Sequence, residues 1–420
     1  MISLNKISDE IGKGVFAKRS FIPGCFIMKE KPIVSSQFSW SKVYKYLACD
    51  GCLRPLETFS ENIQRLSNNY CLDSFETYKN FCPYKTYSVS LYKCPVCNAP
   101  FCSEVCFKHS NHDFLCFPVT PAPIEALDEA WRMIHMPPET TSIMAILKFI
   151  IFCVKHQTKA HDFLINIKDS TTDTSGDFVH KLVGNKFQEQ RECIFNLFNT
   201  ALRFILSEKL GKTTHEEQQE LLETSKVAKY VSLDGFSLLL SLFGRNQQGI
   251  STSPFSSWRM AVEEHLLSKT HFPSQWGIIP DWQIKLTKFQ ESVDNLYEHL
   301  DKTVGQFLDV EGAGIYKDQH YINHSCDPNC EIRFVDYNDT LSLVAIKDIN
   351  AEEELTISYI NECELSGSTR QRREILAENY VFHCKCKKCL LSDPNNPTDE
   401  EDNDDDEDDK IEDDKLMDCN

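Results

Sequence analysis

The chain lacks any long run of apolar residues. Its most apolar stretch, residues 143–154, is interrupted by Lys148 and is shorter than the roughly 20 residues that a membrane-spanning helix requires. The first 20 residues carry several charged side chains and no apolar core, so we expect no secretory signal and no membrane anchor. There is no clear basic import signal, and a chain of 48.4 kDa is expected in both the cytoplasm and the nucleus.

Positive charge is scarce. The 420 residues include 44 lysines and arginines against 63 aspartates and glutamates, a formal net charge of -19. Fourteen acidic residues lie between Asp399 and Asp418, where only two lysines offset them. Such a run repels itself, so we expect residues 392–420 to form a disordered acidic tail. The tail is either solvated without a specific role or attracts a basic protein, such as a histone or a ribosomal protein, and the charge disfavours direct nucleic-acid binding.

Disulfide bonds are not expected, although the chain has 19 cysteines. In the reducing compartment expected of a chain without a secretory signal, clustered cysteines more often bind metal ions. Eight residues with zinc-ligand spacing follow one another, namely Cys49, Cys52, Cys94, Cys97, Cys102, Cys106, His112 and Cys116. A tetrahedral zinc ion takes four such ligands, so these eight residues predict two closed, structural zinc sites.

The order of these pairs resembles the MYND zinc finger, whose ligands interleave. The resemblance implies one zinc ion bound by Cys49, Cys52, Cys102 and Cys106, and another bound by Cys94, Cys97, His112 and Cys116. The chain departs from the family because residues 53–93 form an insertion between the first two pairs. Cys71 and Cys82 lie in this insertion as competing ligands, and His109 competes with His112. A RING-type ubiquitin ligase is the rival interpretation, but the histidine of that module normally comes earlier.

A second group of motifs carries the chemistry. Residues 321–329 read Tyr-Ile-Asn-His-Ser-Cys-Asp-Pro-Asn, and residues 353–359 read Glu-Glu-Leu-Thr-Ile-Ser-Tyr. Residues 12–14 read Gly-Lys-Gly, and residues 380–389 contain Phe382 and three closely spaced cysteines. In this order the four motifs strongly resemble the SET domain of methyltransferases. With the MYND-type pattern between them, the chain resembles the SET and MYND domain family over about residues 10–391, and the acidic tail without C-terminal helical repeats is most like its fifth member.

The resemblance implies an enzyme that transfers methyl groups from S-adenosylmethionine to lysine side chains of a protein. It implies that Tyr359 is catalytic and contacts the cofactor together with Gly12, Lys13, Gly14, Asn323, His324 and Phe382. Asn323 and His324 offer side-chain groups for the amino and carboxylate ends of a methionine-like cofactor, and Phe382 can stack on its adenine. Tyr359 is expected to orient the lysine amine rather than act as a base, because an ordinary tyrosine pKa is about 10.

The cysteines near the C-terminal end are one ligand short of a closed site. Cys384, Cys386 and Cys389 supply three thiolates, and the resemblance supplies Cys326 as the fourth, with Cys330 as a competitor. This third structural zinc ion would tie the C-terminal segment over the cofactor pocket. We expect a monomer that acts on a basic protein substrate. The competing class of function is a non-catalytic adaptor whose MYND module binds partner peptides.

The expected fold is α+β, a SET-domain β-fold split by a zinc finger and a helical insertion. Residues 12–34 predict a β-hairpin around Pro23-Gly24, and strands are expected at 332–334, 341–345 and 355–359. Apolar residues with helical spacing predict helices at 194–205 and 289–307, and a short helix is expected at 370–380. Glu352 stands where the family often has glycine, so the turn is strained there if it needs a positive φ.

These patterns divide the chain into six parts. They are the N-terminal part of the SET domain (1–48), the MYND-type zinc finger (49–116), the helical insertion (117–310), the SET core (311–365), the post-SET zinc segment (366–391) and the acidic tail (392–420).

Overall fold

The computed structural model describes residues 1–8, 11–67, 70–84, 91–135, 141–157, 187–268, 281–304 and 310–391. Over these residues the chain mixes helices with short strands, in agreement with the predicted α+β class. It divides into two compact units. Unit 1 contains residues 1–29, 318–333 and 342 onwards, and unit 2 contains residues 30–317 and 334–341. The predicted acidic tail lies outside the described residues.

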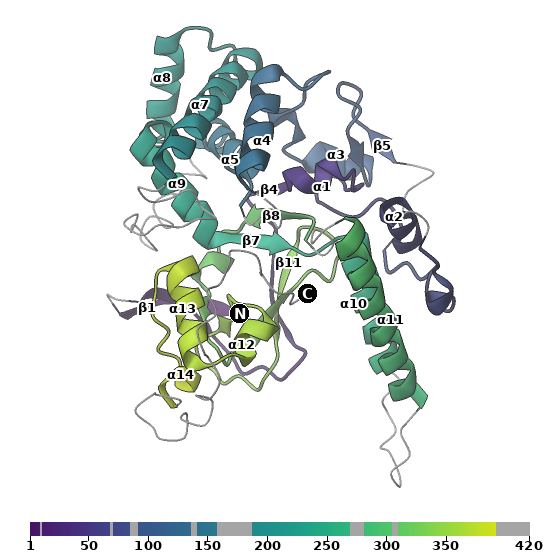
Figure 1. The fold of residues 1–420 in the computed structure, drawn as a ribbon. Coiled ribbons are helices and arrows are strands. Elements are labelled where there is room, and N and C mark those ends of the chain that lie inside the picture. The colour runs from purple at the N-terminus through teal and green to yellow at the C-terminus, as the bar shows by residue number, and fades with distance from the viewer. Residues whose placement is uncertain are drawn as a thin grey trace, which may run out of the picture. The chain divides into compact units, whose positions relative to one another are not determined.

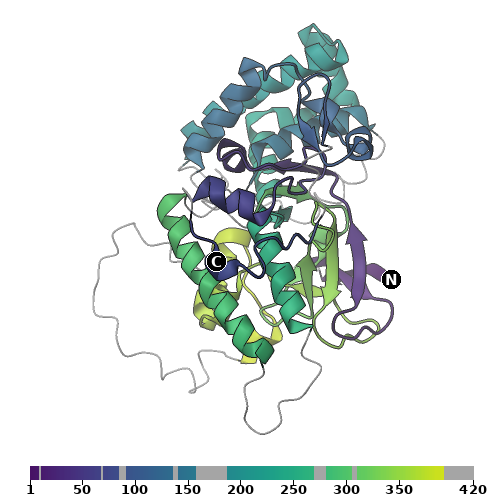
Figure 2. The same ribbon diagram turned by 90° about the vertical axis from the view of Figure 1, so that its right-hand side faces the viewer.

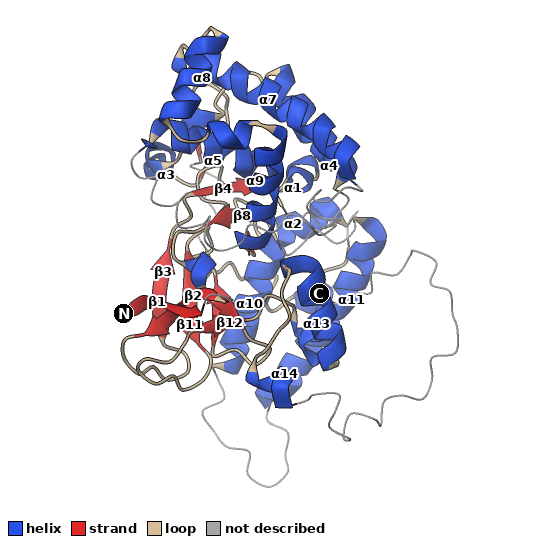
Figure 3. Cartoon of the chain, turned by 90° about the vertical axis from the view of Figure 1, so that its left-hand side faces the viewer, coloured by secondary structure: helices blue, strands red, loops and turns tan. Residues whose placement is uncertain are grey.

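Unit 1 is built from short strands followed by C-terminal helices (Figure 1). Its strands are β1 (Ile2–Ser8), β2 (Gly12–Ala17), β3 (Phe26–Glu30), β9 (Asn323–His324), β10 (Cys330–Arg333), β11 (Leu341–Ala345) and β12 (Thr356–Ile357). Its helices are the 3-10 helix η6 (Gln319–Tyr321), α12 (Glu362–Ser366), α13 (Thr369–Tyr380) and α14 (Lys387–Leu391). β11 lies between β10 and β3, and β9 pairs in parallel with β12. Strands from both ends of the sequence therefore gather in one unit; Figure 3 draws strands in red.

The hairpin predicted over residues 12–34 is wrong in its pairing. The turn exists, because Gly24 has a φ of 85°, but β2 pairs with β1 and β3 pairs with β11. The chain between the two strands bonds to a distant segment: the Gly24 N–H donates to the carbonyl of Ala345 at 2.8 Å, and Phe21 forms a bridge with Ile349. These long-range partners replace the local pairing that the Pro-Gly signal suggests.

Unit 2 contains a mainly helical part and a small sheet. The helical part comprises α4 (Ala122–Ile134), α5 (Ile143–Lys155), α7 (Gln188–Leu210), α8 (His215–Thr224), the 3-10 helix η5 (Ala228–Val231) and α9 (Leu233–Asn246). The apolar stretch of the sequence is α5, which is almost wholly buried and contacts α4, α7 and α9. No described helix combines the length and the apolar character needed to cross a lipid bilayer.

The sheet of unit 2 joins three distant parts of the sequence. β8 (Gly312–Ile315) lies between β4 (Val34–Gln37) and β7 (Gln247–Ile250), antiparallel to both. The zinc-ligand region contributes β5 (Tyr92–Lys93), β6 (Pro100–Phe101), α3 (Glu104–His109) and the 3-10 helix η2 (His112–Phe114), and the short helix α1 (Ser39–Val43) precedes it. All four residues of β8 are buried, so the Gly-Ala-Gly-Ile run is a central strand of this sheet.

The helices predicted from apolar spacing are confirmed. The stripe of Ile194, Phe198 and Ile205 lies on α7 and is fully buried. The stripe from Phe289 to Leu300 lies on α11 (Asp281–Thr303), and the predicted helix at 370–380 is α13. Phe307, the last residue of the second stripe, lies outside the described residues.

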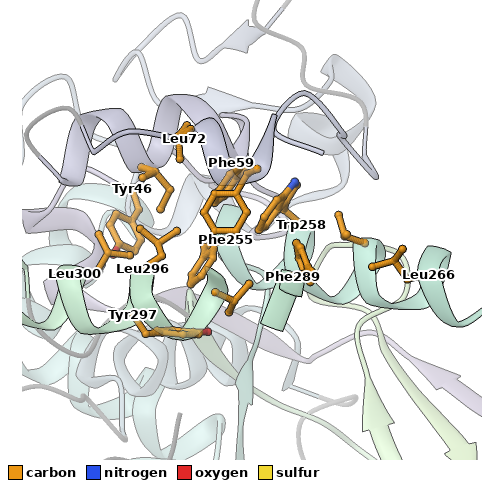
Figure 4. Packing of buried hydrophobic residues seen from close by; sticks show 14 residues of the cluster. Tyr46, Phe59, Leu72, Phe255, Trp258, Leu266, Phe289, Leu296, Tyr297 and Leu300 are labelled. Carbon is orange, nitrogen blue, oxygen red and sulfur yellow. The ribbon is translucent and has the colours of Figure 1, made fainter. Parts of the chain in front are cut away.

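The insertion between the first two zinc-ligand pairs has a structural role that spacing does not reveal. Its helix α2 (Phe59–Leu66) and 3-10 helix η1 (Asp73–Phe75) pack against α10 (Pro254–Leu267) and α11, which lie side by side in green in Figure 2. The rings of Phe59 and Trp258 are stacked with centroids 3.6 Å apart, and Phe255 and Phe289 lie close by (Figure 4). Trp258 also donates from its indole nitrogen to the carbonyl of Tyr78 at 2.8 Å. The insertion therefore clamps the α10–α11 pair.

Candidate active site and metal centres

The parallel pairing of β9 with β12 brings two distant segments together. Asn323 lies opposite Thr356, and His324 lies opposite Ile357. The backbone N–H of Ser325 continues the pairing by donating to the carbonyl of Ile357 at 2.9 Å. Because β12 ends two residues before Tyr359, this register places the Asn323–His324 pair beside Tyr359. The ring centroids of His324 and Tyr359 are 5.4 Å apart.

Asn329, to which sequence reasoning gave no role, fastens the same two segments. Its side-chain oxygen accepts from the backbone N–H of Thr356 at 2.9 Å, and its side-chain nitrogen donates to the carbonyl of Glu354 at 2.8 Å. The residue is only 8% exposed. A buried amide needs such partners, so the last residue of the Asn-His-Ser-Cys-Asp-Pro-Asn run holds the loop beside β12.

Gly14 lies where the backbone approaches three side chains closely. A Cβ atom at this position would lie 2.6 Å from Cδ1 of Ile7, 2.8 Å from Oε1 of Glu354 and 3.0 Å from Nδ2 of Asn323. That Nδ2 atom donates to Oε1 of Glu354 at 2.8 Å and to the carbonyl of Lys13 at 3.3 Å. Within the described residues the side-chain oxygen of Asn323 has no hydrogen-bond partner, so it can accept from the amino group of a ligand.

The other members of the glycine-rich motif act differently. Gly12 has a φ of 84°, and no atom lies within 4 Å of the position that a Cβ would take, so glycine there serves the backbone conformation. The ammonium group of Lys13 lies 5.8 Å from the centre of the Tyr321 ring. The motif therefore contributes one conformational glycine and one close-approach glycine to the same strand, β2.

Both ring nitrogens of His324 have partners inside the fold. Nδ1 accepts a hydrogen bond from the backbone N–H of Tyr359 at 3.0 Å, and Nε2 lies 3.2 Å from Sγ of Cys326. Both ring nitrogens are thus engaged inside the fold, and the predicted contact of His324 with the cofactor stays a prediction. Its partners are the backbone of Tyr359 and a cysteine of the C-terminal cluster.

Tyr359 is held from two sides. Its hydroxyl donates to the carbonyl of Ile322 at 2.6 Å, and its own carbonyl accepts from the Tyr380 hydroxyl at 3.1 Å. Burial raises the pKa of Tyr359 above its ordinary value, and Tyr380 and Glu354 raise it further. A hydroxyl that gives its proton to a carbonyl and resists ionisation presents lone pairs as an acceptor. It is poorly suited to act as a base near neutral pH.

The aromatic residue predicted to contact adenine lies beside this pair. The Phe382 ring is partly buried, with its centroid 6.3 Å from that of Tyr359 and 6.0 Å from that of His324. It follows Val381, which has a φ of 63° at the end of α13. A β-branched residue rarely adopts this conformation, so the helix ends there under strain and directs Phe382 toward the site. Glu352 has a φ of 64°, the condition under which its turn was expected to be strained.

Four cysteines of unit 1 form one cluster. Their sulfur atoms lie within 4.8 Å of one another, and the members are Cys326, Cys384, Cys386 and Cys389. Sγ of Cys326 is 3.5 Å from that of Cys389 and 3.9 Å from that of Cys384. Four sulfurs placed about 2.3 Å from a zinc ion at tetrahedral angles are about 3.8 Å apart, whereas disulfide sulfurs are about 2.0 Å apart. The spacing fits zinc.

Two further clusters lie in the MYND-type region of unit 2. One consists of Cys49, Cys52, Cys102 and Cys106, and the other of Cys94, Cys97, His112 and Cys116. Sulfur pairs are 3.5 Å apart (Cys49 and Cys106), 3.8 Å apart (Cys52 and Cys102) and 3.6 Å apart (Cys94 and Cys116). These are the interleaved groups that the resemblance implies. With the cluster of unit 1, they provide three four-ligand sites that fit three structural zinc ions.

The competing ligands stay outside these clusters. Cys71 and Cys82 are exposed, and the Cys82 thiol donates to the carbonyl of Tyr84. Cys330 is buried in the apolar core of unit 1. Nδ1 of His109 is 2.8 Å from the carbonyl of Val105 on its own helix.

Asp50 links the two clusters of the zinc finger and was not foreseen. It follows the ligand Cys49 of one cluster, and its Oδ2 atom is 2.5 Å from Nδ1 of His112 in the other. Since the remaining ring nitrogen of His112 is 3.2 Å from Sγ of Cys97, the carboxylate orients the histidine toward its cluster. An acidic residue next to a predicted ligand is the only sequence signal, and it is a weak one.

Helix α13 supports the third cluster with two arginines. The Arg372 side chain is buried and donates to the Thr369 hydroxyl at 3.0 Å and toward Sγ of Cys389 at 3.6 Å. Arg373 donates to the carbonyls of Cys384 and Cys389 at 3.2 and 3.3 Å. Four thiolates around one zinc ion leave a net negative charge, which a buried guanidinium offsets. Sequence spacing gives no sign of this role.

Comparison with known proteins agrees with this geometry. The family model described as SET domain matches residues 155–360. The protein-lysine N-trimethyltransferase SMYD5 of Danio rerio is 35% identical over 412 residues, which cover 96% of this chain and 90% of the relative. The Homo sapiens protein of the same name is 35% identical, with 95% and 89% covered. The histone-lysine N-methyltransferase SMYD3 of Mus musculus is 40% identical over 82 residues, 20% of this chain and 18% of the relative.

Proposed function

The chain belongs to the SET and MYND domain family of protein-lysine methyltransferases, and on that premise we propose that it methylates lysine side chains of basic proteins, with Tyr359 as the residue that orients the lysine amine. Methyl transfer from S-adenosylmethionine to protein lysine is the activity of the family, and the likeness to its fifth member extends over nearly the whole chain. One observation carries the assignment of Tyr359: β9 and β12 pair so that the Asn323–His324 segment and Tyr359 share one site.

At the cofactor end of this site, Gly14 leaves room beside Asn323. The fixed Nδ2 of Asn323 turns its side-chain oxygen toward a ligand, where it can accept from the amino group of the methionine part. The partly buried Phe382 ring offers a face for the adenine. S-adenosylmethionine supplies the electrophilic methyl carbon on its sulfonium. The task left to the protein is alignment of that carbon with an amine.

At the amine end, Tyr359 acts as an acceptor. Its hydroxyl proton is engaged with the Ile322 carbonyl, so the oxygen lone pairs can hold an N–H of the incoming lysine. The buried, aromatic surroundings of Tyr359, Tyr380 and Phe382 favour a neutral amine over an ammonium. The raised pKa of Tyr359 disfavours its use as a base, so the proton leaves to water.

The three zinc ions have a structural part in this proposal. Each cluster offers four protein ligands, which leaves no open position for a catalytic water. The third cluster fixes the segment that carries Phe382 and α13 next to Tyr359. Loss of that zinc ion should therefore reduce activity as well as stability.

The substrate class follows from charge. With a net charge of -19 and fourteen acidic residues between Asp399 and Asp418, the chain attracts a basic protein such as a histone or a ribosomal protein and repels nucleic acid. Relatives are named N-trimethyltransferases, which supports the addition of three methyl groups here. We propose that the chain acts as a monomer in the cytoplasm and nucleus.

The test combines calorimetry with labelled methyl transfer. S-adenosylmethionine is titrated into the zinc-loaded chain, and the full chain is compared with a chain ending at residue 391 on a basic protein at low and high salt. We expect one cofactor site in both chains, and faster, more salt-sensitive transfer by the full chain. If the folded, zinc-loaded chain binds no cofactor, the result favours the alternative function, a non-catalytic adaptor that binds partner peptides. Equal rates and equal salt dependence would remove the tail from substrate attraction.

A further inference from the structure

His324 stands between the C-terminal metal cluster and Tyr359. Nε2 of its ring is 3.2 Å from Sγ of Cys326, one of the four cluster cysteines, and Nδ1 is 3.0 Å from the backbone nitrogen of Tyr359. Cys326 is buried and His324 partly buried, so neither contact is displaced by bulk water. One rigid ring therefore joins a metal ligand to the backbone of the residue placed at the lysine amine.

The hydrogen-bond partners fix the tautomer of this ring. A backbone N–H can only donate, so Nδ1 must be the unprotonated acceptor. In the neutral ring the proton is then on Nε2, where it points at the Cys326 sulfur. A thiolate bound to zinc accepts hydrogen bonds, and donors of this kind orient the ligand and stabilise the metal-bound form. The same ring thus serves the metal at one nitrogen and Tyr359 at the other.

We propose that His324 is a positioning residue that couples the zinc site of Cys326, Cys384, Cys386 and Cys389 to the backbone of Tyr359. This rests on the proposed function, because it assigns a consequence for methyl transfer. The Asn-His-Ser-Cys order suits the role, since only one residue separates His324, at the end of β9, from the metal ligand Cys326. Zinc binding fixes Cys326, Cys326 fixes the ring, and the ring holds the N–H of Tyr359.

A second set of contacts, through helix α13, also connects the metal cluster to Tyr359. The His324 ring is therefore needed to hold only part of the Tyr359 backbone. Helix α13, anchored to the cluster by Arg372 and Arg373, ends at Tyr380, whose hydroxyl donates to the Tyr359 carbonyl. The helix therefore holds the carbonyl side of Tyr359 and the ring holds its N–H side. Removal of the ring contact alone should let Tyr359 tilt while the cluster and the helix persist.

Two isosteric substitutions separate the two ends of the ring. In His324→Asn the side-chain oxygen takes the place of Nδ1, which keeps the acceptor for Tyr359 and removes the donor to Cys326. In His324→Gln the side-chain nitrogen takes the place of Nε2, which keeps the donor and removes the acceptor. The variants are compared with the wild type in zinc release to a chromogenic chelator and in kcat and KM. The kinetic phase missing from Cys326→Ala identifies the third site.

The two variants should differ in which property they lose more. For His324→Asn we expect zinc release from the third site about tenfold faster, the lower end of the effect of removing a partner of a metal ligand, and a smaller loss of kcat than in His324→Gln. For His324→Gln we expect wild-type zinc release and a kcat about tenfold lower, with KM for S-adenosylmethionine little changed.

The outcomes separate this proposal from the proposed function. If the wild type transfers methyl groups but the two variants show the same pattern of losses, or neither differs from the wild type, the coupling through His324 is wrong and the enzyme assignment stands. If the wild type itself transfers none, the proposed function fails. Zinc release needs no turnover, so equal release from His324→Asn and the wild type overturns the link to Cys326 even then.

Discussion

The hydroxyl of Tyr359 donates a hydrogen bond to the backbone carbonyl of Ile322, with 2.6 Å between the two oxygens. Ile322 directly precedes the Asn323–His324 pair, so the tyrosine side chain is tied to the segment that its backbone also meets through His324. Tyr359 is therefore bonded twice, through its side-chain hydroxyl and through its backbone N–H, to a segment more than 30 residues earlier in the sequence. This double attachment gives Tyr359 the fixed position that alignment of an amine with a methyl group requires.

Gly14→Ala should weaken cofactor binding without loss of metal. The added Cβ would lie 2.6 Å from Cδ1 of Ile7, 2.8 Å from Glu354 and 3.0 Å from Asn323, so these side chains and the hydrogen bond between Glu354 and Asn323 must shift. We expect calorimetry to show a Kd for S-adenosylmethionine at least about tenfold higher, about 1.4 kcal/mol of lost binding, with zinc content unchanged.

Gly12→Ala is the matched control for this change. No atom lies within 4 Å of a Cβ there, but the φ of 84° costs an alanine about 1 kcal/mol in stability. Its effect should appear in thermal unfolding more than in the Kd. Equal losses of cofactor affinity in both variants would contradict the close-approach role of Gly14.

Trp258→Ala should cost about 3–5 kcal/mol of unfolding free energy. The Trp258 ring is fully buried against Phe59 and Phe75, and its nitrogen bonds to Tyr78, so the substitution removes the clamp between the insertion and α10. Met260→Ala on the same helix, at a position 40% exposed, should change stability by less than about 0.5 kcal/mol. Denaturant unfolding measures both, and similar losses would show that the clamp contributes little.

Asp50→Ala should loosen the second zinc site. Without the carboxylate, His112 loses the partner that fixes its ring, and metal affinity at the site should fall about 10-fold to 100-fold. Asp113→Ala removes an exposed carboxylate that pairs with Lys155 and should leave zinc affinity unchanged. Competition with a chelator of known affinity measures each variant. Zinc retention by Asp50→Ala equal to that of the control would show that Asp50 merely fills space.

The metal groups were predictable because thiolate and histidine spacing reflects a local chemical requirement. All three groups of four come together as spacing and family resemblance implied, although 58 residues separate Cys326 from Cys384. What joins the clusters to their surroundings was not predictable. Asp50 contacts His112 and Arg372 contacts Cys389, and both partners are distant in the sequence. One acidic or basic residue among many gives no indication of such a partner.

The pairing partner of a strand was harder to predict from the sequence than the position of the strand. The Pro-Gly turn and β11 were predicted, yet β3 pairs with β11 rather than with β2. Periodicity shows which residues are extended but not which distant strand takes their hydrogen bonds. The same limit explains His324: the motif marks it as functional, while its two ring partners, Tyr359 and Cys326, appear only when β9 and β12 pair.

Glu311 should make stability depend on pH. Burial is the main cause that raises its pKa from 4.5 to about 8, with a contribution from Glu57, while a hydrogen bond from Gln37 opposes the rise. A raised pKa means that the folded state favours the protonated form, so the contribution of Glu311 to stability is fully present below about pH 4.5 and is lost as pH rises toward 8.

Glu311→Gln keeps the acceptor for Gln37 and cannot ionise. Its stability relative to the wild type should therefore increase between pH 6 and pH 8, as measured by denaturant unfolding at each pH. Glu298→Gln changes an exposed side chain of α11, so the difference in unfolding free energy between this variant and the wild type should stay constant over the same pH range. A constant difference between Glu311→Gln and the wild type would show that Glu311 does not titrate in this window.

Transfer of labelled methyl groups from S-adenosylmethionine into the proteins of a cell lysate, by the wild type and by Tyr359→Phe, tests the central claim most directly. The substitution removes one oxygen and leaves every zinc ligand in place, so both chains should contain three zinc ions and fold alike. We predict strong labelling by the wild type and a loss of at least about 100-fold, roughly 2.7 kcal/mol of barrier, in Tyr359→Phe. Undiminished labelling by the variant would contradict the role of Tyr359.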